Sequence, residues 1–232
     1  MPAETPDIPG LLAVATQEGH GLTALSPGAC ATALGLDSLT LCLLDHSGLE
    51  LVWYDPADTA GVAFEDLQFT LGEGPTVDAA RTGDVVLVPD LHAVPEDRWP
   101  ALLAATHPKP AQAAHAVPVH LGVARLGVLT GHRSTVGMLT RPEMSDLLAL
   151  AEGVTAILTT PHGIHDMSSS NPLPLHRALI HQATGALTVL LGISVEEALA
   201  RLRAYAFTHD IPLMDVAHDV VDHGFDLDGL PR

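Results

Sequence analysis

The spacing of apolar residues changes along the first 160 positions, which predicts both helices and strands. Apolar residues from Leu11 to Leu36 recur at helical intervals and are interrupted at Ser26-Pro27-Gly28. A broken helical segment is therefore expected there. Met138 to Thr160 is a longer amphipathic stretch and predicts another helix. Residues 1–10 are rich in proline and are expected to form a flexible N-terminus.

Short β-type runs occupy the region between these helical segments. Leu39 to Leu44 and Leu49 to Tyr54 are joined by Asp45-His-Ser-Gly48, a pattern that predicts a hairpin. Strands of this kind, flanked by helices, predict an α+β domain with a central antiparallel sheet. Further strands are expected at Phe64–Leu71, Val85–Val88, Ala114–Val119 and Val123–Thr130, with Gly122 in the turn of the last pair, and short helices at 76–82 and 98–106.

After this region the chain loses its periodicity. Residues 162–174 contain Met-Ser-Ser-Ser-Asn-Pro-Leu-Pro, a composition typical of a linker. The pattern therefore places an α+β domain at 11–161, a second domain at 175–226 and a tail at 227–232.

Three short helices that share one small core are expected after the linker. The first covers residues 175–191 and ends at Gly192. Its apolar face is expected to hold Leu175, Leu179, Ala183, Ala186, Leu187 and Leu190. Its polar face, on the opposite side, is expected to hold Arg177, His181, Thr184 and Thr188.

The second helix begins with a capping-box pattern, Ser194-Val-Glu-Glu197. The Ser194 hydroxyl is expected to accept from the Glu197 amide, while the Glu197 carboxylate reaches back to Ser194. Pro212 suits the first turn of the third helix. The expected core positions are Val195, Ala198, Leu199, Leu202, Tyr205 and Ala206 in the second helix and Leu213, Val216, Ala217 and Val220 in the third.

Composition adds a strongly acidic charge to this outline. The net charge is −18, from 28 acids and 10 bases, and Lys109 is the sole lysine. Such a charge repels phosphate backbones at long range, so composition alone argues against nucleic-acid binding. No apolar run is long enough to span a bilayer, and a cytoplasmic protein with no membrane association is expected. Cys30 and Cys42 are expected to be buried small hydrophobes, with a disulfide or redox pair as the alternative.

Candidate chemistry in the α+β domain is weak. Gly72-Glu-Gly-Pro75 could cradle a phosphate, but it lacks a following lysine, and a sharp strand-to-helix turn is the other interpretation. Asp90 could line a ligand pocket or cap the next turn. A metal site from His107, His115 and His120 is disfavoured, because five residues along one strand place the last two on opposite faces. No nucleophile elbow, paired carboxylates or kinase set is present, so no enzyme, cofactor or metal is expected.

Three stretches of the C-terminal region resemble the ANTAR domain, a three-helix RNA-binding module of bacterial transcription antiterminators. They are Leu175 to Leu187, Gly192 to Ala206 and Pro212 to Val220. Upstream, Phe69-Thr-Leu-Gly-Glu-Gly-Pro75 and Val85-Val-Leu-Val-Pro-Asp90 resemble a GAF sensor domain of the type fused to ANTAR in actinobacteria. The resemblance implies a signal-responsive regulator that binds paired RNA hairpins, stabilises an antiterminator and acts as a homodimer. The GAF part would supply a signal input, with an unknown small-molecule ligand, or a dimerisation surface.

The resemblance also implies where RNA would bind. The expected contacts are Arg177, His181, Thr184 and Thr188 on the first helix and Arg201 and Arg203 on the second. The polar face of the first helix could instead be an ordinary solvated face. Arg201 and Arg203 could instead pair with Glu196 or Glu197.

Acidic residues leave a second function open. Where many relatives are basic, the third helix and the C-terminus hold His218, Asp219, Asp222, His223, Asp226 and Asp228, and residues 173–232 carry eight acids against four arginines, a net charge of −4. Phosphate contacts supply much of RNA affinity. The alternative is therefore an ANTAR-like bundle that no longer binds RNA and acts through a protein partner. Pairing of the helices at 11–34 and 139–160 between subunits is a further expectation.

Overall fold

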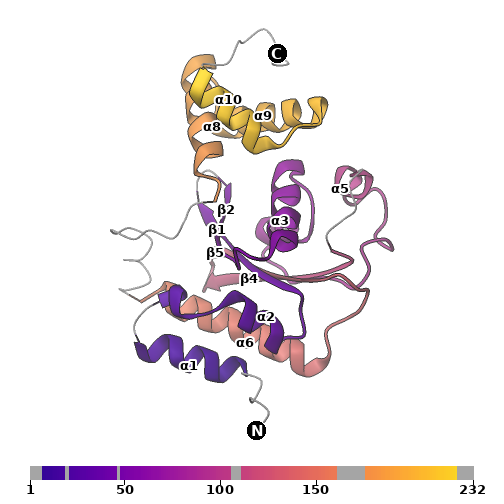
Figure 1. The fold of residues 1–232 in the computed structure, drawn as a ribbon, viewed down its shortest axis with the longest axis vertical. Helices are drawn as coiled ribbons and strands as arrows, with labels where there is room; N and C mark the ends of the chain where they lie inside the picture. The colour runs from indigo at the N-terminus through magenta and orange to yellow at the C-terminus, as the bar shows by residue number, and fades with distance from the viewer. Residues whose placement is uncertain (1–6, 19–20, 46–47, 106–110, 161–175, 224–232) are drawn as a thin grey trace. The chain divides into compact units, whose positions relative to one another are not determined.

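A sheet surrounded by helices and a separate group of three helices make up the described chain (Figure 1). The computed structural model describes residues 7–18, 21–45, 48–105, 111–160 and 176–223. The first part, the sheet unit, ends with α6, and the second part, the helical unit, begins before α8. The expected linker at 162–174 and tail at 227–232 lie outside the described residues.

The sheet unit follows the expected order of elements with one exception. Its helices are α1 Ile8–Glu18, the 3₁₀ helix η1 Gly21–Ala24, α2 Pro27–Ala33, α3 Thr59–Leu71, α4 Pro75–Thr82, α5 Pro100–Ala104 and α6 Arg141–Leu158. Its strands are β1 Ser38–Asp45, β2 Gly48–Trp53, β3 Val86–Val88, β4 Ala113–Leu121 and β5 Ala124–Arg133. The exception is α3, which occupies the segment Phe64–Leu71 that was expected to be a strand.

The expected α+β architecture with an antiparallel sheet is confirmed. The five strands lie in the order β2-β1-β5-β4-β3. β5 pairs antiparallel with both β1 and β4, and β3 pairs antiparallel with β4. A register shift between Val119 and His120 interrupts the β4–β5 ladder near its turn, where Gly122 has a φ of +60°.

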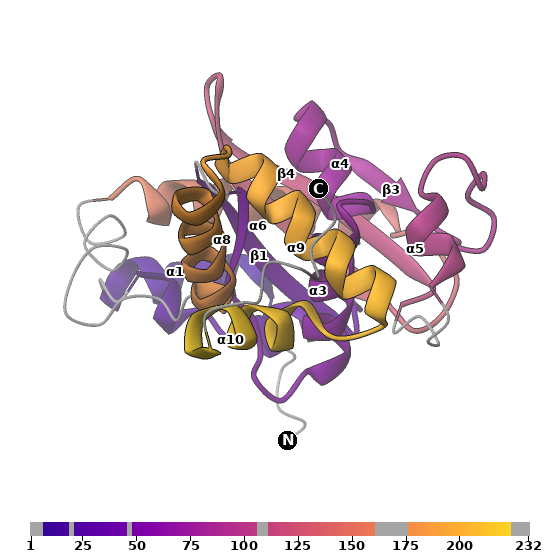
Figure 2. The ribbon, with the colours of Figure 1, turned by 90° about the horizontal axis from the view of Figure 1, so that it is seen from above.

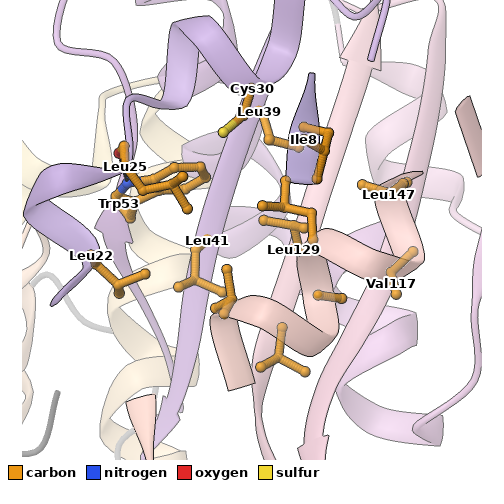
Figure 3. Packing of buried hydrophobic residues seen from close by; sticks show 14 of the residues in the cluster. Ile8, Leu22, Leu25, Cys30, Leu39, Leu41, Trp53, Val117, Leu129 and Leu147 are labelled. Carbon is orange, nitrogen blue, oxygen red and sulfur yellow. Dashed lines mark hydrogen bonds between the residues drawn. The ribbon is translucent and has the colours of Figure 1, made fainter. Parts of the chain in front are cut away.

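Two helical layers cover the sheet. α1, α2 and α6 lie over one face, where leucines of β1 and β5 pack against side chains of these helices (Figure 3). Leu39, Leu41 and Leu129 are central to this cluster, and Ile8 joins it from the start of α1. Burial of Ile8 explains why helix α1 begins within the segment 1–10 that was expected to be flexible. A helix break is present at Ser26, as expected, and the Ser26 hydroxyl accepts from the Ala29 amide and caps α2. The preceding helix is shorter than expected, because α1 ends at Glu18 and the 3₁₀ helix η1 follows.

The opposite face of the sheet packs against α3 and α4 and contains a buried polar cluster. The Glu65 carboxyl group on α3 is 2% exposed. It accepts from the Thr40 hydroxyl (3.1 Å), the Thr76 hydroxyl (3.0 Å) and the Cys42 thiol (3.6 Å). Thr76 also lies 2.9 Å from the Thr130 hydroxyl. One side chain therefore joins α3 to β1, α4 and, through Thr76, β5.

This cluster explains why the strand predicted at Phe64–Leu71 is wrong. Phe64, Leu67, Phe69 and Leu71 alternate with polar residues, and polar residues were assumed to face water. In α3 the buried positions include Glu65 and Gln68 and follow helical spacing instead. Asp58 caps the start by accepting from the Gly61 amide (2.9 Å), and Gly72, with a φ of +67°, ends the helix.

His115 gives the sheet unit a dependence on pH. The side chain is fully buried on β4, and burial together with the nearby Arg133 lowers its pKa from 6.5 to about 4. In the unfolded chain His115 is protonated as the pH falls through about 6.5, whereas in the folded chain it is protonated only near pH 4. The stability that His115 contributes is thus complete above about pH 6.5 and is lost as the pH falls towards 4.

We expect the free energy of unfolding to fall by roughly 3 kcal/mol between pH 6.5 and 4 through this residue, at about 1.4 kcal/mol per pKa unit. Urea titrations at several pH values compare the wild type with His115→Gln, which cannot take up the proton. The pKa of His132 is also lowered by burial, so both proteins retain that contribution. Parallel pH curves for the two proteins would contradict the assignment to His115.

Candidate nucleic-acid interface

The helical unit consists of three helices in mutual contact. They are α8 Ala178–Leu191, α9 Val195–His209 and α10 Leu213–His223, and Figure 2 shows their axes as three sides of a triangle. Gly192, with a φ of +64°, ends α8 as expected. The expected inner face of α10 is confirmed, because Leu213, Val216, Ala217 and Val220 are all buried. On α9, Ala198, Leu199, Leu202 and Ala206 are buried as expected, whereas Val195 and Tyr205, which were also expected in the core, are only half-buried.

α8, in contrast, turns its polar residues towards the other helices. Arg177 is 1% exposed and Thr184 is 2% exposed, while His181 and Thr188 are half-buried. Leu190, expected in the core, is exposed. The prediction that Arg177, His181, Thr184 and Thr188 form an outward polar face opposite the core is therefore wrong.

The composition of α8 explains this error. Between Ala178 and Leu191 the helix holds no charged residue, and its apolar residues lie on every side. The threonines carry no penalty for facing inward, because the helix itself satisfies their hydroxyls. Thr184 donates to the Ile180 carbonyl (2.7 Å), and Thr188 donates to the Thr184 carbonyl (3.0 Å). The hydrophobic pattern alone could therefore not predict which face of α8 packs against the other helices.

Two of the candidate RNA-binding arginines lie close together. Arg203 on α9 is half-buried, and burial together with the positive charge of Arg177 lowers its pKa to about 10. Two guanidinium groups thus share a poorly solvated region where α8 and α9 meet. Neither of them is an ordinary solvent-exposed cation.

The third arginine, Arg201, is engaged on the surface of α9. Its guanidinium donates to the Glu197 carboxylate at 2.6 Å, one helical turn away. This is the intrahelical pairing that was open as an alternative for Arg201. The same contact alters the expected capping box: the Ser194 hydroxyl accepts from the Glu197 amide (3.2 Å), but the Glu197 carboxylate turns towards Arg201 rather than back to Ser194.

Aromatic residues on α9 are functional candidates that the sequence reasoning did not single out. The rings of Tyr205 and His209 are stacked, with centroids 3.9 Å apart and planes inclined by 22°. Phe207 is 63% exposed. The whole chain has only eight Phe, Tyr and Trp residues. Two of these eight residues, Tyr205 and Phe207, lie close together on α9, and this clustering was a sequence signal that could have drawn attention to the helix.

The acidic residues within the described part of the helical unit are at its surface. α9 ends at Asp210, which adopts a left-handed conformation with a φ of +53°. On α10, Asp215, Asp219 and Asp222 are exposed and His218 lies 3.6 Å from Asp222. Residues 176–223 contain six acids and three arginines, a net charge of −3 with neutral histidines.

The glycine-rich segment of the sheet unit forms a tight connection. Gly72 to Gly74 join two helices, α3 and α4, and not a strand and a helix as expected. The Glu73 carboxylate accepts from the Ala101 and Leu102 amides at the start of α5 (2.8 and 3.1 Å). The Gln68 amide oxygen accepts from the Thr76 amide (2.8 Å). The contacts of this segment are thus those of a structural turn.

The other candidates in the sheet unit also have structural contacts. The Asp90 carboxylate accepts from the His92 amide (2.8 Å), in agreement with a capping role. Cys30 and Cys42 are buried thiols that form no disulfide, and burial raises the pKa of Cys30 to about 12. Among the described residues, no three His, Cys, Asp or Glu side chains are placed to hold a metal ion, and His107 lies outside that part of the chain.

One open pocket of about 270 Å³ lies between η1, the start of α2 and the end of β2. Trp53 forms part of its wall and donates from its indole nitrogen to the Leu25 carbonyl (2.7 Å). The lining contains no charged residue. It therefore offers apolar contact but no ionic group to orient a ligand.

Comparison with known protein families matches residues 175–221 to the ANTAR domain. The matched segment coincides with α8, α9 and most of α10. The helical unit belongs to the ANTAR domain family. The buried Arg177 and Thr184 and the exposed Phe207 thus lie within the segment that matches the ANTAR domain.

Solved structures similar to the chain include GAF domains and an enzyme. The GAF domain of a phosphoenolpyruvate-protein phosphotransferase from Coxiella burnetii is 17% identical, with a TM-score of 0.47 over 67% of this chain and 95% of its own. The corresponding GAF domain from Acinetobacter is 16% identical, with a TM-score of 0.49 over 69% and 95%. Free methionine-R-sulfoxide reductase from Neisseria meningitidis is 18% identical, with a TM-score of 0.48 over 68% and 88%. Comparison with curated proteins gave no match.

Across the described ranges, none of the helices taken singly has the length and apolar character needed to cross a membrane. The ANTAR helices α8 and α9 meet these criteria only when combined, and the chain bends by 111° between them.

The burial of Arg177 leads to a test of the ANTAR domain. Arg177→Ala removes a buried side chain, and we expect it to lower the free energy of unfolding by about 1–3 kcal/mol. Arg177→Met keeps most of the apolar stem and should lose less. Gln182→Ala, on the exposed side of α8, is the matched control and should change stability by less than about 0.5 kcal/mol. Equal melting of the Arg177→Ala and Gln182→Ala proteins, followed by circular dichroism, would contradict the observed orientation of α8.

Proposed function

We propose that this protein is a signal-responsive regulator of transcription that binds RNA through its ANTAR domain. The match of residues 175–221 to that family is the observation that supports the proposal. The proposed target is a pair of RNA hairpins, whose binding stabilises an antiterminator. The sheet unit would act as a GAF-type sensor for a ligand still to be identified. We further propose a cytoplasmic, non-enzymatic protein that needs no cofactor.

The six residues proposed to bind RNA fall into two groups that differ in their access to solvent. Arg201 and Arg203 on α9, with His181 and Thr188 at the edge of α8, retain partly exposed side chains. Arg177 and Thr184 are buried and would act by supporting the packing between helices. The proposed RNA surface therefore centres on α9 rather than on the polar residues of α8.

RNA binding is tested by titrating the full-length protein with a labelled two-hairpin RNA at several salt concentrations. Each phosphate neutralised contributes roughly −0.7 to −0.9 to the slope of log K against log salt. We expect measurable affinity at low salt and a negative slope. Fluorescence anisotropy with a single-hairpin RNA as control gives both quantities. Absence of binding at low salt would contradict the proposal.

A protein partner is the second candidate function. It is favoured by the exposed acids Asp215, Asp219 and Asp222 on α10 and by the net negative charge of the described ANTAR helices. An acidic helix face attracts basic protein surfaces and repels phosphates. Failure of the RNA titration together with stable folding of the ANTAR domain would leave this candidate as the better one.

We also propose that the protein is a homodimer. α1 and α6 pack against each other within one chain, and the side chains of Val14 and Leu148 on these helices are exposed. Pairing between subunits would cover such apolar residues. Light scattering at micromolar concentration should give twice the 24.2 kDa mass of the chain. A monomeric mass that stays constant on tenfold concentration would contradict the dimer.

A further inference from the structure

The ANTAR domain has few cations that can meet RNA phosphates. Arg177 is buried, the pKa of Arg203 is lowered beside it, and Arg201 pairs with Glu197. Residues 176–223 contain six acids and only these three arginines. Because phosphate contacts depend on cations, they contribute little here. An RNA ligand of this domain must therefore gain most of its binding energy from another kind of contact.

The surface of α9 offers aromatic contacts in place of cationic ones. Tyr205 follows Arg201 by four residues, and Phe207 follows Arg203 by four residues. Residues four apart lie on the same side of a helix, so α9 carries two arginine–aromatic pairs. The exposed small residues Ala200 and Ala204 lie between the two pairs by the helical repeat.

The first aromatic position is preorganised by its neighbour. His209 stacks on the Tyr205 ring and donates from Nδ1 to the Tyr205 carbonyl, with 2.9 Å between the two atoms. This hydrogen bond fixes the tautomer of the neutral imidazole and leaves Nε2 as an acceptor. A base placed on this stack would meet both an aromatic surface and an acceptor for an amino group.

The second aromatic position is accessible to solvent. Phe207, at 63% exposure, is the one Phe, Tyr or Trp side chain that is largely exposed among the residues the structure describes. Val189 on α8 is even more exposed, at 85%, but its side chain has no π face on which a base could stack. Aromatic side chains with neighbouring arginines are the groups that bind splayed, unpaired RNA bases.

We propose that the outer surface of α9 is a base-stacking site for unpaired nucleotides in RNA loops. Bases stack on the Tyr205–His209 pair and on Phe207, while Arg201 and Arg203 lie within reach of the adjacent phosphates. This site rests on the proposed function in RNA binding and specifies its chemistry. Stacking provides most of the affinity, so the ligand is a loop base and not the backbone of a duplex.

The test uses the full-length protein and a two-hairpin RNA carrying 2-aminopurine at single loop positions. Phe207→Ala and Tyr205→Leu should each weaken binding on the order of tenfold and reduce the quenching of 2-aminopurine fluorescence. Phe207→Tyr and Tyr205→Phe keep an aromatic ring and should bind like the wild type. Val189→Ala, on α8, is the matched control for loss of an exposed apolar side chain. A fully paired duplex of the same length should compete poorly.

Salt dependence provides a second, independent readout. With two arginines at the site, the slope of log K against log salt should be no steeper than about −1.4, at roughly −0.7 per phosphate contact on a single strand. Arg201→Gln should make the slope shallower, whereas the aromatic variants should leave it unchanged. A steep slope in the wild type would overturn stacking as the main source of affinity.

The outcomes separate this site from the proposed function. If the wild type binds RNA and both Phe207→Ala and Tyr205→Leu retain full affinity, the α9 site is overturned and RNA binding stands. If the wild type binds no RNA at low salt, both are overturned. Circular dichroism melting of each variant identifies loss of folding, and the ring-retaining variants then decide whether the aromatic group itself is needed.

Discussion

The buried carboxyl group of Glu65 is the constraint on which the sheet unit depends. A polar group with almost no access to water must find partners inside the protein, or burial becomes costly. Here the donors are the Thr40 hydroxyl and the Cys42 thiol on β1 and the Thr76 hydroxyl on α4. Satisfying Glu65 therefore requires α3 and α4 to lie on the sheet together. The tight connection at Gly72–Gly74 and the helical path of α3 both follow from that requirement.

The burial of polar side chains limited what the sequence could predict in both units. Strands with alternating or continuous apolar residues were predictable, as were α9 and α10, whose buried positions are Ala, Leu and Val. The strand expected at α3 and the inner face expected for α8 were wrong, because each of these helices buries polar side chains. Glu65 is satisfied by partners from distant positions, and Thr184 is satisfied by its own helix. Neither arrangement can be predicted from hydrophobic periodicity, because that method assumes that every polar residue faces solvent.

The candidate site was predictable only in part for a related reason. The arginines of α9 could be found from sequence, and Glu196 or Glu197 could be named as possible partners, but the sequence could not decide between such a pair and an RNA contact. Whether Arg201 contacts Glu197 or a ligand depends on side-chain geometry, and the lowered pKa of Arg203 depends on the position of Arg177 on another helix. The Tyr205–His209 stack also needs coordinates. Residue type and spacing predicted the helix, whereas the exposure and contacts of its side chains could be read only from the structure.

Several arginines of the described part of the sheet unit are also engaged in contacts within the protein. Arg133 donates to the Gly35 and Met138 carbonyls and pairs with Glu143, while Arg125 donates to carbonyls near the end of α4. Arg81 and Arg98 both pair with Asp78. These arginines therefore link segments of the fold, and their charge is partly neutralised by neighbouring carboxylates.

This has a consequence for selectivity among cellular nucleic acids. Sequence-independent attachment to polyanions comes almost entirely from exposed cations, and it keeps many nucleic-acid-binding proteins occupied on non-target molecules. With a net charge of −18, and with Arg81, Arg98, Arg133 and Arg201 in ion pairs, this protein is expected to have little such attachment. A regulator of this kind would remain unbound in the presence of abundant ribosomal and messenger RNA. Its occupancy on a target transcript would then reflect the fit of a few bases and the concentration of that transcript alone.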